Sequence, residues 1–137
     1  MTVRFDAAIP QFTVPDVVRT AEYYRDILGF QLSGYWDGEE VHQSPERRAV
    51  FGIVWRDNVE VFFSRARRNA KPRTGRAPGA YDAYFRVKDV DAFAADIKKR
   101  GAKIIDGPAK RPYGAREVVV RDCNGLILAF GEDERST

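Results

Sequence analysis

Apolar positions along this chain follow two spacings, one typical of helices and the other of half-buried strands. After Asp16, whose side chain is suited to cap a helix, four apolar residues fall on one helical face: Val17, Ala21, Tyr24 and Leu28. After Asp89 the same spacing returns at Val90, Phe93, Ala94 and Ile97. The sequence therefore predicts two helices, of which the first ends near Gly29 and the second at Gly101.

Alternation of apolar and polar residues predicts the strands. Six segments show it or carry short β-prone runs: 9–14, 31–37, 49–55, 59–63, 81–87 and 103–106. Residues 39–47 predict a polar loop, and Gly107-Pro108 predicts a turn. Near the C-terminus, Asn124-Gly125 lies between two apolar runs, which is a strong signal for a β-hairpin.

The pattern occurs twice. Val14-Pro15-Asp16-Val17 matches Val87-Lys88-Asp89-Val90 at an offset of 73 residues, and Gly29 matches Gly101 at an offset of 72. Such internal repetition fixes the architecture. We expect an α+β fold in which two βαβββ modules, about 7–65 and about 81–132, are joined by a connector at 66–80 within one domain of 1–137.

Each module should form a curved sheet with its helix on the outer face and a concave face on the other side. In the strand at 81–87, Ala83, Phe85 and Val87 suit the helix side, so Asp82, Tyr84 and Arg86 face the concavity. In the first strand the residues expected to face the concavity are Ile9, Gln11 and Thr13. A polar set in a cleft suggests a ligand site, although an open sheet also turns such residues to plain solvent.

The net charge of +3 belongs to one loop. Residues 65–80 contain six cations and no acid: Arg65, Arg67, Arg68, Lys71, Arg73 and Arg76. Removing these six from the 23 basic residues leaves 17 against 20 acidic residues. We expect a solvated connector and no nucleic-acid binding, because no aromatic residues interleave the cations. A regulatory module that binds a partner through this loop is an alternative.

Composition sets the compartment that we expect. The single cysteine, Cys123, excludes an internal disulfide and fits a reducing cytoplasm. No apolar run approaches the roughly 18 residues of a membrane helix, and the N-terminus lacks the pattern of a signal peptide. We therefore expect a cytoplasmic protein that does not bind a membrane.

Three segments resemble the vicinal-oxygen-chelate superfamily, which includes glyoxalase I, extradiol dioxygenases, and fosfomycin- and bleomycin-resistance proteins. They are VPDVVRTAEYYRDILGF at 14–30, VKDVDAFAADIKKRGAKI at 87–104 and PYGAREVVVRDCNGLILAF at 112–130. The resemblance covers nearly the whole chain and implies a glyoxalase/bleomycin-resistance-like fold. The resemblance says little about the reaction, because one fold hosts many chemistries.

Metal enzymes of this family take one ligand from each of four strands. The corresponding positions here are Ile9, Asp82, Ala129 and Phe62, or Glu60 in place of Phe62 if the register slips by two. Isoleucine, alanine and phenylalanine cannot coordinate a cation, and one carboxylate does not hold a divalent ion tightly. We therefore expect no metal and no cofactor. The sole histidine, His42, lies at none of these positions, and we expect it to be solvated.

Without the metal ligands, the chain resembles the antibiotic-sequestering branch of the family, whose members bind a ligand without reacting with it, in clefts formed by two chains. We therefore predict a homodimer that binds a small, planar or cationic molecule. The binding would serve to sequester a drug or a metabolite. The candidate ligand-binding residues are Gln11, Trp36, Phe62, Asp82, Tyr84, Tyr113, Arg116 and Glu117. Trp55 alternates with Phe51 and Ile53, and we expect it in the core.

An enzyme is the alternative. A metal-independent isomerase or lyase would use Asp82 or Glu117 as general base and Tyr84 or Tyr113 as acid. No nucleophile motif supports it, since Cys123 lies in a turn. Arg116 and Glu117 are adjacent in a strand and should point to opposite faces, so we do not expect them to pair.

Overall fold

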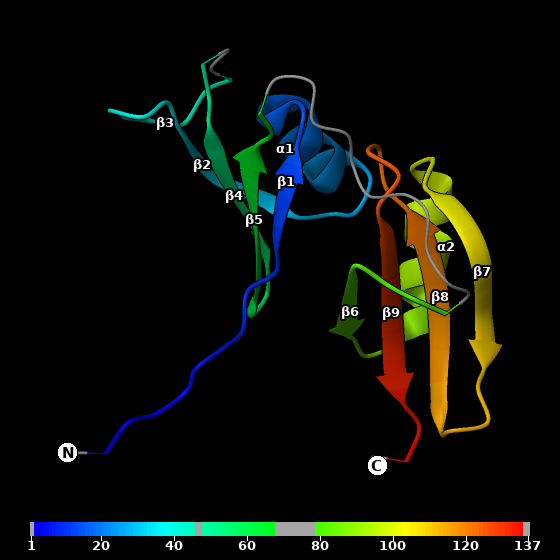
Figure 1. Ribbon diagram of the computed structural model, residues 1–137. Coiled ribbons are helices and arrows are strands. Elements are labelled where there is room, and N and C mark those ends of the chain that lie inside the picture. Colours follow the sequence, from blue (N-terminus) through cyan, green and yellow to red (C-terminus); the bar gives the residue numbers. More distant parts are fainter. Residues whose placement is uncertain (1, 46–47, 68–78, 136–137) are drawn as a thin grey trace.

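The structure is a computed structural model that describes residues 2–45, 48–67 and 79–135 (Figure 1). Two helices and nine strands follow one another along the described residues. In chain order they are β1 (Gln11–Val14), α1 (Val17–Asp26), β2 (Gln31–Trp36), β3 (Val41–His42), β4 (Phe51–Arg56), β5 (Val59–Arg65), β6 (Ala83–Arg86), α2 (Val90–Lys99), β7 (Lys103–Lys110), β8 (Ala115–Arg121) and β9 (Ile127–Asp133).

The strands form two sheets, one for each module (Figure 1). The first has the order β1-β5-β4-β2-β3 and the second the order β6-β9-β8-β7. The pairs β1·β5 and β6·β9 are parallel, and the other pairs are antiparallel. The expected α+β fold of two βαβββ modules is confirmed. Each module has its own sheet, as expected, but the predicted 39–47 loop contains the short strand β3.

Local chemistry explains where the helices begin. The Asp16 carboxylate accepts a hydrogen bond from the Arg19 backbone N–H at 3.0 Å, and α1 buries Val17, Ala21 and Tyr24. The Asp89 carboxylate accepts from the Ala92 backbone N–H at 3.3 Å in α2. These caps satisfy N–H groups that have no partner within a helix.

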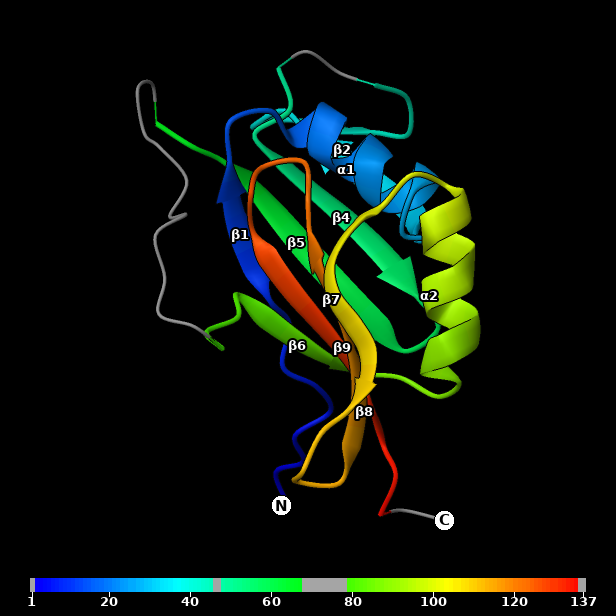
Figure 2. The same cartoon turned by 90° about the vertical axis from the view of Figure 1, so that its right-hand side faces the viewer.

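A chain of aromatic rings joins the two modules into one core. The Tyr24 ring packs edge-on against Phe63 of β5 at 4.9 Å between centroids and against Phe30 at 5.8 Å. Phe30 in turn contacts Phe85 of β6, whose ring stacks on Phe130 of β9 at 5.0 Å. The turn between β8 and β9 reaches α1 (Figure 2), so α1 packs against both modules.

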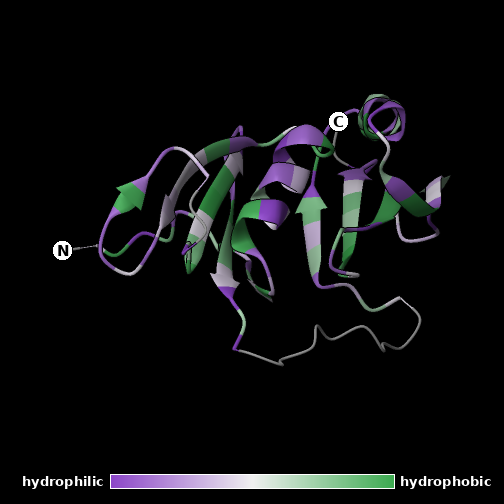
Figure 3. Ribbon diagram, turned by 90° about the horizontal axis from the view of Figure 1, so that it is seen from above, coloured by the Kyte–Doolittle hydropathy of each residue, from purple (hydrophilic) through white to green (hydrophobic). Residues whose placement is uncertain are grey.

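Hydropathy alternates along the strands (Figure 3), with one face of each sheet packed on its helix and the other open. In each sheet, we call the face that is not packed on the helix the open face. The hairpin at Asn124-Gly125 is confirmed, with Gly125 at φ +82°. The predicted turn at Gly107-Pro108 is wrong, because β7 continues to Lys110 through two register irregularities.

No helix among residues 2–45, 48–67 and 79–135 combines the length and the apolar character needed to cross a bilayer. Most of the predicted basic connector, residues 68–78, lies outside the described residues.

Candidate functional site

The open face of the second sheet carries a buried carboxylate. Along β8, Val118 and Val120 belong to the core on the helix side, so Glu117 and Val119 point to the open face. Glu117 is nevertheless only 1% exposed. A carboxylate removed from water costs free energy unless it accepts hydrogen bonds or pairs with a cation.

Three side chains meet that need. The hydroxyl of Tyr84 donates to Glu117 Oε2 at 2.7 Å, and the hydroxyl of Tyr113 donates to Oε1 at 2.6 Å. Arg111 Nε donates to Oε1 at 3.1 Å. Tyr84 comes from β6, whereas Arg111 and Tyr113 come from the loop between β7 and β8. We call these four residues the Glu117 cluster.

Small residues on β9 allow Tyr84 to reach the carboxylate. Tyr84 lies beside Ala129 in the β6·β9 register, and Gly131 lies beside Glu117 in the β8·β9 register. A Cβ placed on Gly131 would overlap the Tyr84 hydroxyl oxygen and lie 2.5 Å from Cζ. The tyrosine side chain therefore crosses β9 through the space that a side chain at position 131 would fill.

We expect Gly131→Ala to push the Tyr84 ring away from Glu117. Burial and the hydrogen bond to Glu117 raise the pKa of Tyr84 from 10.0 to about 12 in the intact cluster. In the variant this pKa should fall toward 10, as followed by ultraviolet titration of tyrosinate. Unfolding should cost about 1–3 kcal/mol less, the usual penalty of overpacking. The penalty should vanish in a Tyr84→Ala background, and its persistence there would contradict the assignment.

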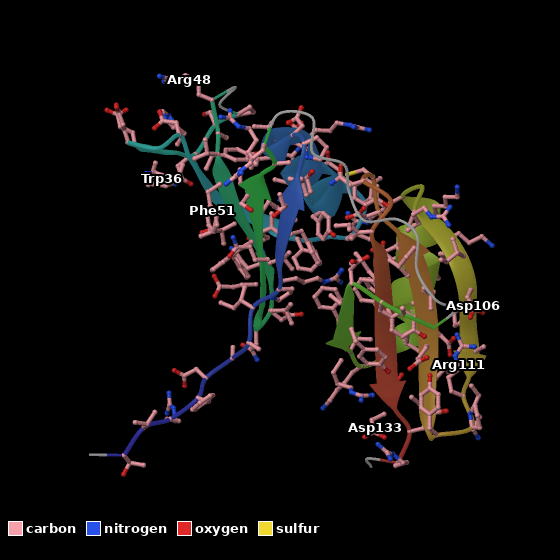
Figure 4. The ribbon with its side chains drawn as sticks, viewed as in Figure 1. Trp36, Arg48, Phe51, Asp106, Arg111 and Asp133 are labelled. Atoms are coloured by element: carbon pink, nitrogen blue, oxygen red, sulfur yellow. The ribbon has the colours of Figure 1, made fainter. Side chains whose placement is uncertain are left out.

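Arg111 links the cluster to a second carboxylate. Its Nη2 donates to Asp106 Oδ2 at 2.8 Å, and the loop is closed by Arg111 N–H donating to the Ala115 carbonyl at 2.7 Å. Figure 4 shows Arg111 and Asp106 close together beside β7. Burial opposes the guanidinium charge, but Glu117 and Asp106 outweigh it and raise the pKa of Arg111. Arg111 therefore stays charged and neutralises part of this acidic site.

The same contacts set the protonation of the cluster. Burial alone would raise the pKa of Glu117, but the hydrogen bonds from Tyr113, Tyr84 and Arg111 lower it below 4.5. The hydrogen bond to Glu117, followed by burial, raises the pKa of Tyr113. At neutral pH the site thus holds a charged carboxylate and two protonated phenols. Both phenol protons are committed to Glu117, so the hydroxyls offer only lone pairs to a ligand.

The open face of the first sheet is aromatic. Its side chains lie on β2, β4 and β5: Trp36, Phe51, Ile53, Trp55 and Phe62. Trp36 is 45% exposed and Trp55 is 36% exposed, and the Phe51 and Phe62 rings are 5.3 Å apart. Figure 4 shows Trp36 and Phe51 on the same side of this sheet. The prediction that Trp55 is a core residue is wrong.

The other predicted ligand-binding residues are scattered. Gln11 is exposed on the open face of β1, beside Phe62. Asp82 Oδ2 accepts the Ile127 backbone N–H at 2.8 Å at the sheet edge. Arg116 donates to Asp91 of α2 at 2.9 Å, on the side opposite Glu117. As expected, Arg116 and Glu117 do not pair, so the structure does not bring Arg116 into the cluster.

The positions that correspond to the family's metal ligands do not fit a metal ion. Phe62 lies beside Gln11 as Ala129 lies beside Tyr84, so the register selects Phe62 over Glu60 as the counterpart of Ala129. Neither Phe62 nor Ala129 has a donor atom. The nearby carboxylate of Glu117 already accepts three hydrogen bonds, one of them from a guanidinium. We derive no chemistry through a metal at this site.

A group of potential ligands lies elsewhere, at the β2–β3 hairpin. One ligand atom each from Asp37, Glu40 and His42 lie within 4.8 Å of one another. Asp37 accepts His42 Nε2 at 2.8 Å, Arg48 Nη2 at 3.3 Å and the backbone N–H of Glu40 at 2.7 Å. The hydrogen bonds from the Glu40 N–H, from His42 and from the Glu39 N–H, in that order, hold the pKa of Asp37 well below its usual range. The expectation of a merely solvated His42 is wrong, because its ring contacts Asp37.

Two members of the site were missed by sequence reasoning. Arg111 was not considered, although it immediately precedes the Pro112-Tyr113-Gly114 segment at the start of the hairpin. Gly131 gave no signal, because a glycine near a strand end has many structural explanations. Only the register of β8 with β9 shows that Gly131 lies opposite Glu117.

The chain matches the Glyoxalase/Bleomycin resistance protein/Dioxygenase superfamily over residues 7–130 and belongs to that family.

Sequence identity with individual relatives is low. The chain is 26% identical over 123 residues to methylmalonyl-CoA epimerase, mitochondrial, of Mus musculus, covering 84% of this chain and 66% of that protein. It therefore spans just under two thirds of that relative.

Two solved structures show the same fold. A glyoxalase-related enzyme from Clostridium phytofermentans superposes with a TM-score of 0.71 at 20% identity, covering 97% of each chain. A bleomycin-binding protein from Streptomyces verticillus, complexed with copper(II)-bleomycin, superposes with a TM-score of 0.66 at 23% identity, covering 94% of this chain and 97% of that chain. At these identities the likeness is one of fold.

Proposed function

We propose that this protein binds a small planar or cationic molecule at its open faces without a metal ion. The observation that carries the proposal is the Glu117 cluster. It places a charged carboxylate beneath two phenol hydroxyls that can accept, and not donate, hydrogen bonds toward the open side. Tyr84 is 39% exposed and Tyr113 is 55% exposed, so both can contact a ligand.

Charge and ring chemistry select the ligand class. Glu117 and Asp106 carry two negative charges, Arg111 pairs with both, and Arg86 lies over the Tyr84 ring at 5.2 Å. A ligand that presents N–H donors complements the hydroxyl lone pairs, and a cationic group complements the two carboxylates. The faces of Tyr84 and Tyr113, and of Trp36 across the first sheet, suit stacking with a planar ring system, as aromatic side chains stack on bases.

The proposal includes a homodimer. β1 and β6 are sheet edges with no strand partner on their outer sides among residues 2–45, 48–67 and 79–135. The aromatic open face of the first sheet is also a broad exposed apolar patch, which is typical of an interface. A second copy would place that face over the Glu117 cluster and close a cup around the ligand. Antibiotic or metabolite sequestration is the use that such a cup supports.

A ligand screen with a mass measurement tests the proposal. We expect light scattering to give a dimer, and bleomycin-type, mitomycin-type or acridine-type compounds to raise the melting temperature. The shift should be lost in Tyr113→Ala and kept in the control Tyr23→Ala, whose hydroxyl lies on α1 beside the Arg121 carbonyl. A monomer that no planar or cationic compound stabilises would refute the sequestration proposal.

A metal-independent isomerase or lyase is a second candidate, and the similarity to the mouse epimerase is its support. The cluster favours binding instead. The lowered pKa of Glu117 makes it a weak base, and the raised pKa values of Tyr84 and Tyr113 make them weak acids. Asp82, the other candidate base, accepts a backbone N–H at the sheet edge. If a turnover is found, its survival in both Glu117→Gln and Asp82→Asn would reject these base assignments.

A further inference from the structure

A pocket lies at the seam between the two modules, and Glu117 is not among the residues that line it. It has a volume of about 430 Å³, which falls in the range of small-molecule sites. The turn between β4 and β5 forms one side, and the segment from the end of β6 toward α2 forms the other. Aromatic side chains contribute to its lining: Phe30, Phe85, Phe93 and Phe130.

The fixed polar group of this pocket is Arg56, the last residue of β4. Its Nη1 donates to the Leu28 carbonyl oxygen at 2.8 Å, at the end of α1. Its guanidinium carbon lies 5.3 Å from the ring centroid of Phe93 on α2. Gly29, at φ +78°, makes room for it, because a Cβ there would lie 2.6 Å from Nη1. The guanidinium is thus held in place by both modules.

The cations that line the pocket outnumber its acidic residues. Arg56, Arg86 and Lys88 all line it, and none of them forms an ion pair within the described part of the chain. Arg86 lies over the Tyr84 ring at 5.2 Å, and its charge helps to lower the pKa of Asp133, which does not line the pocket. Only Asp57 opposes these three charges among the lining residues. A concave site with a surplus of one charge concentrates ions of the other sign.

We propose that this seam pocket binds a small aromatic carboxylate. One of the five N–H groups of the Arg56 guanidinium donates to the Leu28 carbonyl. The remaining N–H groups can donate to the two oxygens of a planar carboxylate. The phenylalanine rings take the apolar body of the ligand, and Lys88 and Arg86 add attraction at the rim. The anionic ligand of the seam pocket differs in charge from the cationic ligand proposed for the Glu117 cluster, and Arg86 is the residue that lies next to both sites.

The test uses 2-naphthoate as the probe, with the uncharged 2-naphthamide and acetate as comparisons. Amide chemical shifts from ¹H–¹⁵N spectra report which site is occupied. We expect naphthoate to shift the amides of Asn58, Val87 and Lys88 and to leave that of Glu117 unmoved. Naphthamide and acetate should each bind at least about tenfold more weakly, because each lacks either the charge or the ring.

Variants assign the contacts. Arg56→Gln should raise the dissociation constant of naphthoate about tenfold or more, and Lys88→Gln by about threefold. Lys103→Gln, an exposed lysine of β7 outside the pocket, should leave it unchanged. Lys88→Gln touches no packed contact and provides the test if Arg56→Gln fails to fold. Equal affinity for naphthoate and naphthamide, shifts centred on Glu117, or no binding would overturn the proposal.

Discussion

Glu117→Ala is expected to destabilise the fold by about 2–4 kcal/mol, the larger of the two effects that we predict for buried carboxylates. Glu117 is 1% exposed and accepts three hydrogen bonds. Removing one partner of a buried charged pair costs more than the pair contributes, because the remaining donors lose their acceptor. Tyr84 and Tyr113 are partly exposed and can bind water again, which keeps the loss below the upper limit for buried pairs.

Urea unfolding at pH 7 measures this loss. Glu117→Gln should cost less, about 1–2 kcal/mol, because its amide oxygen still accepts while its NH₂ group meets donors. The matched control is Glu60→Ala, an exposed residue of β5, which should change stability by no more than about 0.5 kcal/mol. Tyrosinate titration adds a second readout, since Tyr84 should return toward its ordinary pKa of 10.0. Equal stability of Glu117→Ala and Glu60→Ala would show that the Glu117 cluster does not stabilise the fold.

Features that depend on neighbouring residues in the sequence could be predicted. The caps at Asp16 and Asp89 and the buried faces of both helices follow from local spacing. The repeat at an offset of 73 residues gave the two βαβββ modules, because equal patterns fold into equal units. Alternation along residues 81–87 also placed Tyr84 on the open face of the second sheet.

Which face of a strand is covered could not be read from alternation alone. On β4, Phe51, Ile53 and Trp55 alternate with Gly52 and Val54. The larger set was expected to face the core, yet α1 packs on the side of Gly52. A Cβ on Gly52 would lie 2.8 Å from Val17 Cγ1, so the close approach of α1 requires a glycine there. The bulky residues are therefore left on the open face.

The convergence of the Glu117 cluster was likewise beyond local reasoning. Tyr84, Arg111 and Glu117 come from β6, a loop and β8, and their meeting depends on the register of three strand pairs. The space that Gly131 leaves for Tyr84 is a property of that register. His42 was misjudged for a similar reason, since its partner Asp37 lies across a hairpin that the sequence did not predict.

A second buried carboxylate joins the modules. Asp122, in the turn between β8 and β9, is 5% exposed and accepts the Tyr24 hydroxyl at 2.8 Å. The same carboxylate accepts the backbone N–H groups of Asn124 and Leu126. Beside it, Asn124 Nδ2 donates to Thr20 Oγ1 at 2.9 Å. Tyr24 and Thr20 belong to α1, so this turn attaches the second module to the first.

The pKa of Asp122 gives the attachment a defined pH dependence. Burial raises it above 3.8, although the hydrogen bonds from Tyr24, Asn124 and Leu126 lower it in part. An acid whose pKa is higher in the folded state contributes stability that is fully present below the unfolded pKa. That contribution is lost as the pH rises through the folded pKa, because the charged form is the disfavoured one. The Tyr24 hydroxyl limits the loss by donating to the charged form.

Tyr24→Phe is therefore expected to cost about 1.5–3 kcal/mol at pH 7, the range for a hydrogen bond to a charged group. The cost should shrink as the pH falls to about 3, below the ordinary pKa of 3.8, where Asp122 is mostly protonated in both states and the bond is mostly a neutral one. Urea unfolding at the two pH values measures the difference. Tyr23→Phe is the control, because the Tyr23 hydroxyl is near enough to Asp122 to feel its charge but forms its hydrogen bond with the Arg121 carbonyl at 3.5 Å. A cost of Tyr24→Phe that is the same at both pH values would mean that Asp122 is not charged in the folded protein at pH 7.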